Sequence, residues 1–455
     1  MPLQSIDPTT GELFAEYPEA DPAEVDRILG AADAAAAAWR RSSFDERASL
    51  MRAAASTLRG RVTPLAELMV REMGKPIGQA RAEVEKCAWV CDYYADNAER
   101  FLAPEPADTD ASKSYVAYRP IGVVLAVMPW NFPLWQVIRF AAPTLMAGNG
   151  GVLKHAFNVT GCAFAIEAMF REAGFPEDLF RVLPVGSARV GEVIRDRRIR
   201  AVTLTGSGPA GSAVASTAGE VLKKTVLELG GSDPYVVLED ADLAHTVEAC
   251  VTSRLINAGQ SCVAAKRFIV VNAVLAEFEQ RFVERMQAAQ VGNPMDESTD
   301  VGPLARVDLR NELHEQVQAS VAKGATVALG GTVPDGPGAF YPPTVLTGVQ
   351  PGMPAYDDEL FGPVAAIIGA RDESDAVRIA NDTEFGLGAA VFTRDIARGE
   401  RIARDELEAG ACFVNAFVKS DPRLPFGGVK ASGYGRELAG HGIREFVNAK
   451  TVYVQ

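Results

Sequence analysis

The sequence predicts an α/β protein with two successive series of alternating strands and helices. The first series begins at Ile121, after a helical N-terminal region, and the second begins after Gly231 and runs to about Asn415. In both series, short apolar runs alternate with stretches long enough to form helices. This alternation predicts parallel sheets covered by helices on both faces, which bind ligands at the carboxyl ends of their strands.

The expected elements follow in order along the chain. The region from Asp21 to about Phe101 has apolar residues at helical spacing, and a connector with prolines and aspartates leads to a predicted strand at 114–118. Strands of the first series are expected at 123–127, 151–154, 180–184, 201–204 and 225–229, with helices at 136–146, 161–173, 188–195 and 209–218. Strands of the second series are expected at 235–238, 268–271, 364–368, 389–393 and 412–415. The C-terminal segment 450–455 is expected to pair with the Tyr115 segment or with a second subunit.

Length and composition narrow the class of protein. A chain of 455 residues, 48% hydrophobic and 23% charged, predicts a globular enzyme of two or three domains. A net charge of −14 argues against a nucleic-acid or anionic-membrane partner, because both require a basic face. Membrane-length apolar runs, signal-peptide features, metal-binding motifs and Cys-x-x-Cys pairs are lacking, which predicts a cytoplasmic protein without a metal. Cys87 and Cys91, one helical turn apart, are expected to serve packing.

The main chemical signal is the pair Cys262 and Glu228. Cys262 follows small and polar residues, typical of an accessible loop or of a helix start, where its pKa would be lowered. Glu228 lies between two leucines and precedes two glycines. With only 4 scattered histidines in the chain, a nucleophilic thiol would need a carboxylate as its proton acceptor. The alternatives are a buried structural thiol and a solvated or salt-bridged carboxylate.

Three further motifs suggest a nucleotide cofactor. The sequence from Gly206 to Gly211 fits GxGxxG after a strand, and the free N–H groups of the helix it opens would suit a phosphate. Asn131, between prolines in PWNFP, presents a fixed amide that suits an oxyanion, and Lys154 at a strand end suits a ribose or a 2′-phosphate. The alternatives are a glycine-rich helix entry that binds nothing, a helix-capping asparagine and a solvated lysine.

Together these residues resemble the aldehyde dehydrogenase superfamily over essentially the whole chain. The shared signatures, in order, are 129–133 (PWNFP), 153–154, 205–207, 227–231 (LELGG), 259–262 (GQSC), 359–363 (ELFGP), and 425–428 (PFGG) with 432–433. The resemblance implies a Rossmann-variant nucleotide domain, an α/β catalytic domain and a small β oligomerisation flap. It also implies that GxGxxG does not act in the ordinary way and that Glu228 is a base rather than a ribose ligand.

The resemblance implies a role for each matching residue. Cys262 would attack the aldehyde, the Asn131 amide and the Cys262 N–H would hold the oxyanion, and hydride transfer would leave a thioester that Glu228 hydrolyses through water. The cofactor, NADP or NAD, would be bound by Trp130, Lys154, Gly206, Ser207, Leu229, Glu359 and Phe361.

Within the superfamily the chain is similar to the bacterial succinate-semialdehyde dehydrogenase branch. There Arg139 would bind the distal carboxylate of the substrate, Ser420 would assist it, and Trp135 would line the same tunnel. Ile256 replaces an arginine of related branches and favours an uncharged aldehyde. Phe157 stands where a glutamate is frequent in NAD-preferring relatives, so no carboxylate there would repel the 2′-phosphate of NADP, whereas the bulky ring would crowd it; both cofactors stay open.

The sequence therefore predicts oxidation of succinate semialdehyde to succinate. The alternatives are a dehydrogenase for uncharged aliphatic or aromatic aldehydes, a coenzyme A-acylating enzyme, and a non-catalytic nucleotide-binding protein. Three parts are expected: a nucleotide domain (1–112 and 122–229), a catalytic domain (230–440) and a flap (113–121 and 441–455). The flap predicts a homodimer or homotetramer.

Overall fold

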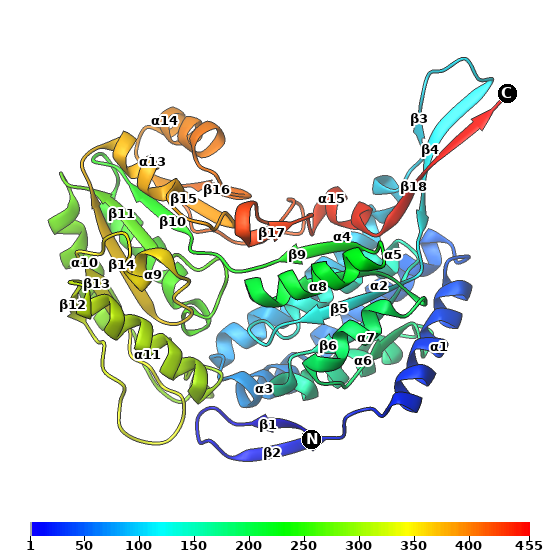
Figure 1. Cartoon of the computed structure of the whole chain (residues 1–455), viewed down its shortest axis with the longest axis horizontal. Coiled ribbons are helices and arrows are strands. Elements are labelled where there is room, and N and C mark those ends of the chain that lie inside the picture. The colour runs from blue at the N-terminus through cyan, green and yellow to red at the C-terminus, as the bar shows by residue number, and fades with distance from the viewer. Residues whose placement is uncertain (1) are drawn as a thin grey trace.

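The first series of strands forms one sheet in the centre of the molecule (Figure 1). The structure is a computed structural model that describes residues 2–455. The strand order is β17-β9-β8-β5-β6-β7, and all neighbours are parallel except β17 and β9. Its strands are β5 (Val123–Met128), β6 (Gly150–His155), β7 (Phe180–Val182), β8 (Ile199–Thr205), β9 (Lys224–Glu228) and β17 (Gly433–Tyr434). All five predicted strands are confirmed, because apolar runs such as VVLAVM in β5 are buried on both faces of the sheet.

The second series forms a seven-stranded sheet in the other half of the molecule (Figure 1). Its order is β12-β13-β14-β11-β10-β15-β16, with only β12 antiparallel to its neighbour. Its strands are β10 (Pro234–Val237), β11 (Arg267–Val271), β12 (Thr326–Leu329), β13 (Thr344–Thr347), β14 (Val364–Ala370), β15 (Gly388–Phe392) and β16 (Ala411–Val414). The five predicted strands are confirmed, whereas β12 and β13 were not predicted.

Helices cover both sheets and fill the N-terminal region. The N-terminal helices are α1 (Pro22–Trp39), α2 (Phe44–Gly60), α3 (Val62–Met73) and α4 (Ile77–Phe101). Those of the first sheet are α5 (Trp135–Met146), α6 (Thr160–Glu172), α7 (Val190–Arg195) and α8 (Gly208–Glu220), close to the predicted ranges. The remaining helices are α9 (Leu243–Leu255), α10 (Leu275–Gln287), α11 (Val307–Ala322), α12 (Pro354–Asp357), α13 (Glu373–Asn381), α14 (Ile396–Arg401) and α15 (Ala439–Glu445).

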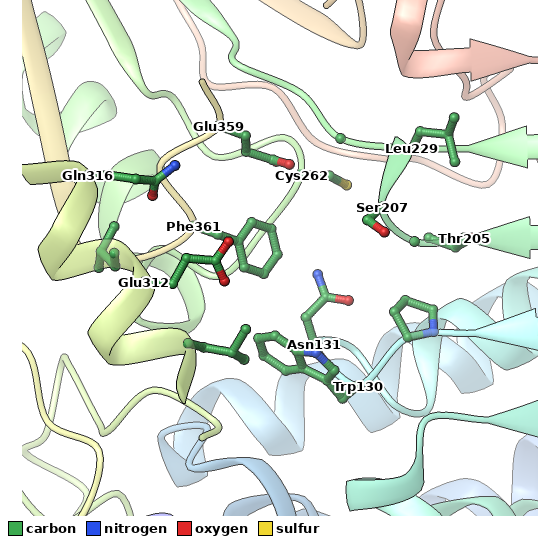
Figure 2. A pocket seen from close by; sticks show the side chains of 15 residues that line it. Trp130, Asn131, Thr205, Ser207, Leu229, Cys262, Glu312, Gln316, Glu359 and Phe361 are labelled. Atoms are coloured by element: carbon green, nitrogen blue, oxygen red, sulfur yellow. The ribbon is translucent and has the colours of Figure 1, made fainter. Parts of the chain in front are cut away.

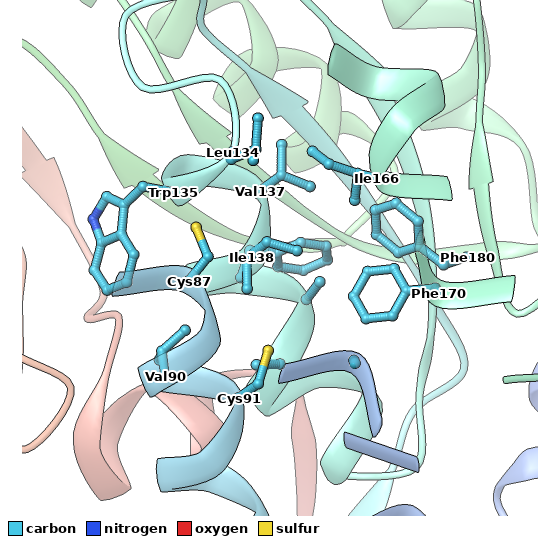
Figure 3. Packing of buried hydrophobic residues seen from close by; sticks show 14 of the residues in the cluster. Cys87, Val90, Cys91, Leu134, Trp135, Val137, Ile138, Ile166, Phe170 and Phe180 are labelled. Carbon is cyan, nitrogen blue, oxygen red and sulfur yellow. The ribbon is translucent and has the colours of Figure 1, made fainter. Parts of the chain in front are cut away.

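The contact between α4 and α5 forms one wall of the candidate site described below. Figure 3 shows Cys87 and Cys91 of α4 next to Ile138 of α5 within the largest apolar cluster. Both thiols are fully buried, which confirms that these cysteines serve packing. Trp135 lies at the margin of the same cluster (Figure 3). The apolar packing therefore fixes the helix faces from which polar side chains reach the site.

A β flap projects from the body of the molecule and carries the C-terminus at its tip (Figure 1). Strand β18 (Val447–Val454) runs antiparallel to β4 (Lys113–Pro120), with Val452 opposite Tyr115, which confirms the predicted pairing of the C-terminal segment. Strand β3 (Glu105–Pro106) borders β4 on its other side. A separate hairpin at the N-terminus joins β1 (Leu3–Ile6) and β2 (Leu13–Tyr17). The division of the chain into three domains stays a prediction.

Candidate active site

Two cavities meet at Cys262, the only residue that lines both of them among residues 2–455. The first, of about 280 Å³, is lined by seven other predicted site residues: Trp130, Asn131, Gly206, Ser207, Leu229, Glu359 and Phe361 (Figure 2). The second, of about 310 Å³, is lined by the predicted substrate residues Trp135, Arg139 and Ser420, and by Ile256. The fold thus brings together eleven of the thirteen predicted residues. Lys154 and Glu228 line neither cavity.

The Cys262 loop has an unusual backbone that side-chain hydrogen bonds hold in place. Asn257, Ala258 and Gly259 have φ values of 54°, 53° and 76°, so three successive residues adopt the left-handed conformation. A Cβ at Gly259 would lie 2.1 Å from the carbonyl oxygen of Gly362, so only glycine fits there. The Asn257 amide donates to the carbonyl oxygens of Asn131 (2.8 Å) and of Gln260 (3.1 Å). These bonds attach the Cys262 loop directly to the PWNFP turn.

Lys266, which sequence reasoning missed, holds the other side of this loop. Its ammonium group is 1% exposed and donates to the carbonyl oxygens of Ser261 (2.9 Å), Cys262 (3.0 Å) and Ala264 (3.1 Å). It also lies 3.3 Å from Glu359 Oε1. No local motif distinguishes this lysine from a solvated one, because its three carbonyl partners converge only when the loop folds back.

The Cys262 thiol is protonated in the resting structure. Burial raises its pKa to about 12, although the positive charges of Arg139 and Lys266 act in the opposite direction. Cys262 lies in a turn between the short helix Ile256–Gly259 and β11. The hypothesis that a helix start lowers its pKa is therefore wrong. Attack by the thiol requires a group that accepts its proton.

Asn131 and Cys262 line the same cavity. The Asn131 side chain is 4% exposed, and Nδ2 donates to the carbonyl oxygen of Gln260 at 3.1 Å. An amide nitrogen carries two N–H donors, so the second remains for a ligand in the cavity. Within the described chain, the backbone N–H of Cys262 donates no hydrogen bond. The Asn131 amide and the Cys262 backbone thus each retain an N–H group without a partner in the described chain, and both residues line the first cavity.

Glu228 ends β9 and lies buried beside Gly427. A Cβ at Gly427 would lie 2.6 Å from Glu228 Oε1, so the carboxyl group occupies the space that this glycine leaves open. Its pKa is raised well above 4.5, first by burial and then by the negative charge of Glu437. Neither carboxyl oxygen has a hydrogen-bond partner among residues 2–455. Burial therefore favours the neutral form of the Glu228 carboxyl group in this position, and no hydrogen bond fixes its rotamer.

The first cavity has the groups that a dinucleotide requires. Ser207 is the N-cap of α8 and makes no capping bond with its side chain, so its hydroxyl group is open to a ligand. A Cβ at Gly211 would lie 2.5 Å from a Leu229 methyl carbon, so this glycine allows α8 to approach β9 closely. Across the cavity, Trp130 and Phe361 meet edge to face, with ring centroids 5.7 Å apart (Figure 2).

Of the remaining cofactor candidates, Glu359 lines this cavity and Lys154 does not. Glu359 Oε1 accepts the Gly231 N–H at 3.1 Å, and a Cβ at Gly230 would lie 2.5 Å from Glu359 Oε2. Lys154 lies next to the last residue of β6, with its Nζ 3.5 Å from the Ser187 hydroxyl, and burial lowers its pKa. The residues present fit a nucleotide with polar groups at both ends. No three His, Cys, Asp or Glu side chains within residues 2–455 are grouped so that they could hold a metal ion.

Arg139 in the second cavity already has an internal partner. Its guanidinium group forms an ion pair with Glu437, and the two side chains are 2% and 7% exposed. Nη2 also donates to Thr205 Oγ1 at 3.4 Å, and the guanidinium carbon lies 4.8 Å from the centre of the Phe426 ring. The charge of Arg139 is thus largely balanced within the protein. The motif around Arg139 did not indicate this partner, because Glu437 lies far away in the sequence.

The chain is similar to known proteins over its whole length. A family model described as the aldehyde dehydrogenase family matches residues 1–452. The chain is 51% identical over 454 residues to a probable NADP(+) succinate-semialdehyde dehydrogenase of Synechocystis sp., with 100% of both chains covered. It is 51% identical over 458 residues to an NADP(+) succinate-semialdehyde dehydrogenase of Mycobacterium avium, covering 100% of this chain and 97% of that protein.

A solved structure is similar over nearly the same length. The succinic semialdehyde dehydrogenase of Streptococcus pyogenes, crystallised with NADP⁺, superposes with a TM-score of 0.97 at 37% identity, covering 99% of each chain.

Proposed function

Because the chain belongs to the aldehyde dehydrogenase family, we propose that it oxidises succinate semialdehyde to succinate with NADP⁺ as the hydride acceptor. The observation that carries the proposal is the position of Cys262 at the junction of two cavities. One cavity has the features of a nucleotide site, and the other contains basic side chains. NAD⁺ remains the alternative acceptor. The relatives whose names specify NADP⁺ support the first choice.

The residues divide the reaction between them as follows. The Cys262 thiol gives up its proton to solvent water as its sulfur attacks the aldehyde carbon, and the second N–H of Asn131 and the Cys262 backbone N–H stabilise the negative oxygen that forms. The nicotinamide, when bound, accepts the hydride that leaves this carbon. Glu228 then moves from beside Gly427 towards the resulting thioester, loses its own proton to solvent as it leaves this buried position, and as a carboxylate takes a proton from the attacking water, which it passes to the departing sulfur. Hydrolysis releases succinate and restores the thiol.

Arg139, Trp135 and Ser420 support a substrate that carries a carboxylate, since all three line the second cavity. Ile256 in the same wall, together with the aromatic rings of Phe132, Phe417 and Phe426, favours the second candidate, an uncharged aldehyde. Formation of an acyl-coenzyme A is disfavoured because Glu228 supplies the base for hydrolysis. Complete loss of catalysis, as in a non-catalytic nucleotide-binding protein, is disfavoured by the intact set of Cys262, Asn131 and Glu228.

Steady-state kinetics with paired substrates and cofactors test the proposal. We expect kcat/KM for succinate semialdehyde to exceed that for pentanal by about 10- to 100-fold, because a charge-assisted contact contributes roughly 1.5–3 kcal/mol. NADP⁺ is expected to support a higher kcat/KM than NAD⁺. Equal efficiency for both aldehydes would favour the uncharged-aldehyde candidate. Accumulation of succinyl-coenzyme A after addition of coenzyme A would contradict hydrolysis.

We also propose that the flap joins copies of this chain. Strand β18 is the outer strand of its sheet, and Tyr453 and Val454 are 48% and 46% exposed. An exposed edge with apolar side chains favours pairing with another strand. Sedimentation equilibrium of the full chain is expected to give two or four times the chain mass of 48.5 kDa. A monomer at micromolar concentration would contradict it. The cytoplasmic location stays a prediction.

A further inference from the structure

We propose that Lys86, which no motif singled out, is the cation that binds the distal carboxylate of the substrate in the second cavity. This role rests on the proposed oxidation of an aldehyde that carries a carboxylate. It assigns the ligand contact to a side chain of α4 and leaves Arg139 with its internal partner, Glu437.

Lys86 belongs to a face of α4 that forms one wall of the cavity. Gln79, Ala82, Glu83 and Lys86 all line it, and their three- and four-residue spacing places them along one side of the helix. Lys86 is half-buried, and its Nζ donates to Ser420 Oγ at 2.9 Å. The ammonium group also lies 4.2 Å from the centre of the Trp135 ring. Two residues of the predicted substrate site thus hold the ammonium group in the cavity wall.

The charge of Lys86 is not balanced by the protein. No carboxylate of residues 2–455 lies within 4.0 Å of its Nζ. Glu83 and Asp421 are the carboxylates that affect the pKa of Lys86. Each already has another partner: Glu83 is paired with Lys75, and Asp421 is paired with Arg423. Glu83 in addition accepts the N–H groups at the start of α5. The ammonium group therefore has room for an anionic partner that only a ligand supplies.

The surroundings make such a partner favourable. Burial, with the nearby charge of Arg139, lowers the pKa of Lys86 to about 8, against smaller opposite effects of Cys87, Glu83 and Asp421. The lysine is thus mainly protonated at neutral pH, in a cavity where the aromatic side chains of Phe417 and Phe426 limit hydration. A carboxylate beside it would replace lost water contacts with a charge-assisted hydrogen bond. Cys262 lines the same cavity, so a single ligand bound there can contact both residues.

Three variants test this role: Lys86→Met, Lys86→Arg and, as a control for the loss of one positive charge, Lys323→Met at the exposed end of α11. The readout is the ratio of kcat/KM for succinate semialdehyde to kcat/KM for pentanal. We expect Lys86→Met to lower this ratio by about 10- to 100-fold, mainly through KM for the semialdehyde. Lys86→Arg is expected to keep most of the ratio, and Lys323→Met all of it.

A pH profile adds a readout that does not depend on folding of a variant. Because Lys86 loses its charge as the pH rises through about 8, the ratio for the unmodified enzyme should fall several-fold between neutral and alkaline pH. In Lys86→Arg it should stay flat, since arginine keeps its charge. Pentanal, which lacks a carboxylate, corrects for the titration of Cys262 and Glu228.

The possible outcomes separate this role from the proposed function. A clear preference of the unmodified enzyme for the semialdehyde that persists in Lys86→Met, or that is flat with pH, overturns the role of Lys86 alone. If folded Lys86→Met loses kcat/KM equally for both aldehydes, the role of Lys86 is also overturned, because loss of a purely structural residue would affect both substrates alike. Lack of preference in the unmodified enzyme overturns the proposed substrate and this role together.

Discussion

Replacement of Cys262 by alanine is expected to lower kcat by about 10⁴-fold or more, because it removes the nucleophile on which every later step depends. Within the described residues, no other side chain lines both cavities, so none is placed to substitute for it. The measurement is NADPH production at saturating succinate semialdehyde. Cofactor binding, followed by calorimetry, is expected to remain, since the remaining residues of the nucleotide cavity are unchanged.

Cys412→Ala is the matched control for this loss. Cys412 is also a partly buried free thiol, but its Sγ faces the carbonyl oxygens of Leu407 and Ala409, each at 3.9 Å. It lines neither cavity, so its removal should leave kcat within about twofold of the unmodified value. A Cys262→Ala protein that retains a rate within about tenfold of the unmodified enzyme would contradict covalent catalysis.

Replacement of Glu228 by glutamine is expected to separate the two halves of the reaction. Hydride transfer should still release about one NADPH per active site in a rapid burst, because Cys262 and Asn131 are intact. Turnover after the burst should fall by about 10²- to 10⁴-fold, the usual contribution of a general base. Stopped-flow absorbance shows both phases. Glu408→Gln, at an exposed glutamate paired with Lys430, is the control and should turn over normally.

The pH dependence of thermal stability independently tests the raised pKa of Glu228. Its folded pKa lies above the ordinary value of 4.5, so the folded protein favours the neutral acid. The stability that this group contributes is complete at low pH and is lost as the pH rises from 4.5 through the folded pKa. Glutamine has nearly the same shape without an ionisable proton, so Glu228→Gln should melt at a higher temperature than the unmodified enzyme near pH 8. The difference should shrink towards pH 4.5. Loss of the burst, or lower stability at pH 8, would contradict this account.

The sequence predicted those strands whose burial is evident from their own residues. Parallel strands such as β5 and β14 are buried on both faces and therefore appear as continuous apolar runs. Strand β12 was missed because three of its four residues are exposed and it lies at a sheet edge. Strand β17 has only two residues, and its pairing of Gly433 with Glu228 depends on chain that returns from the far end of the sequence.

The sequence by itself determined which groups are the candidates for reaction and cofactor binding, because Cys262, Asn131 and the turn around Ser207 each lie in a short motif whose residue types suit that chemistry. Only the tertiary structure decided the pKa values of these groups and which side chains surround them. Burial raises the pKa values of Cys262 and Glu228, and Glu437 forms an ion pair with Arg139. The second cavity joins Lys86, Trp135 and Ser420 from three distant segments. Charge and desolvation depend on every group within a few ångströms, and which groups those are is set by packing rather than by order along the chain.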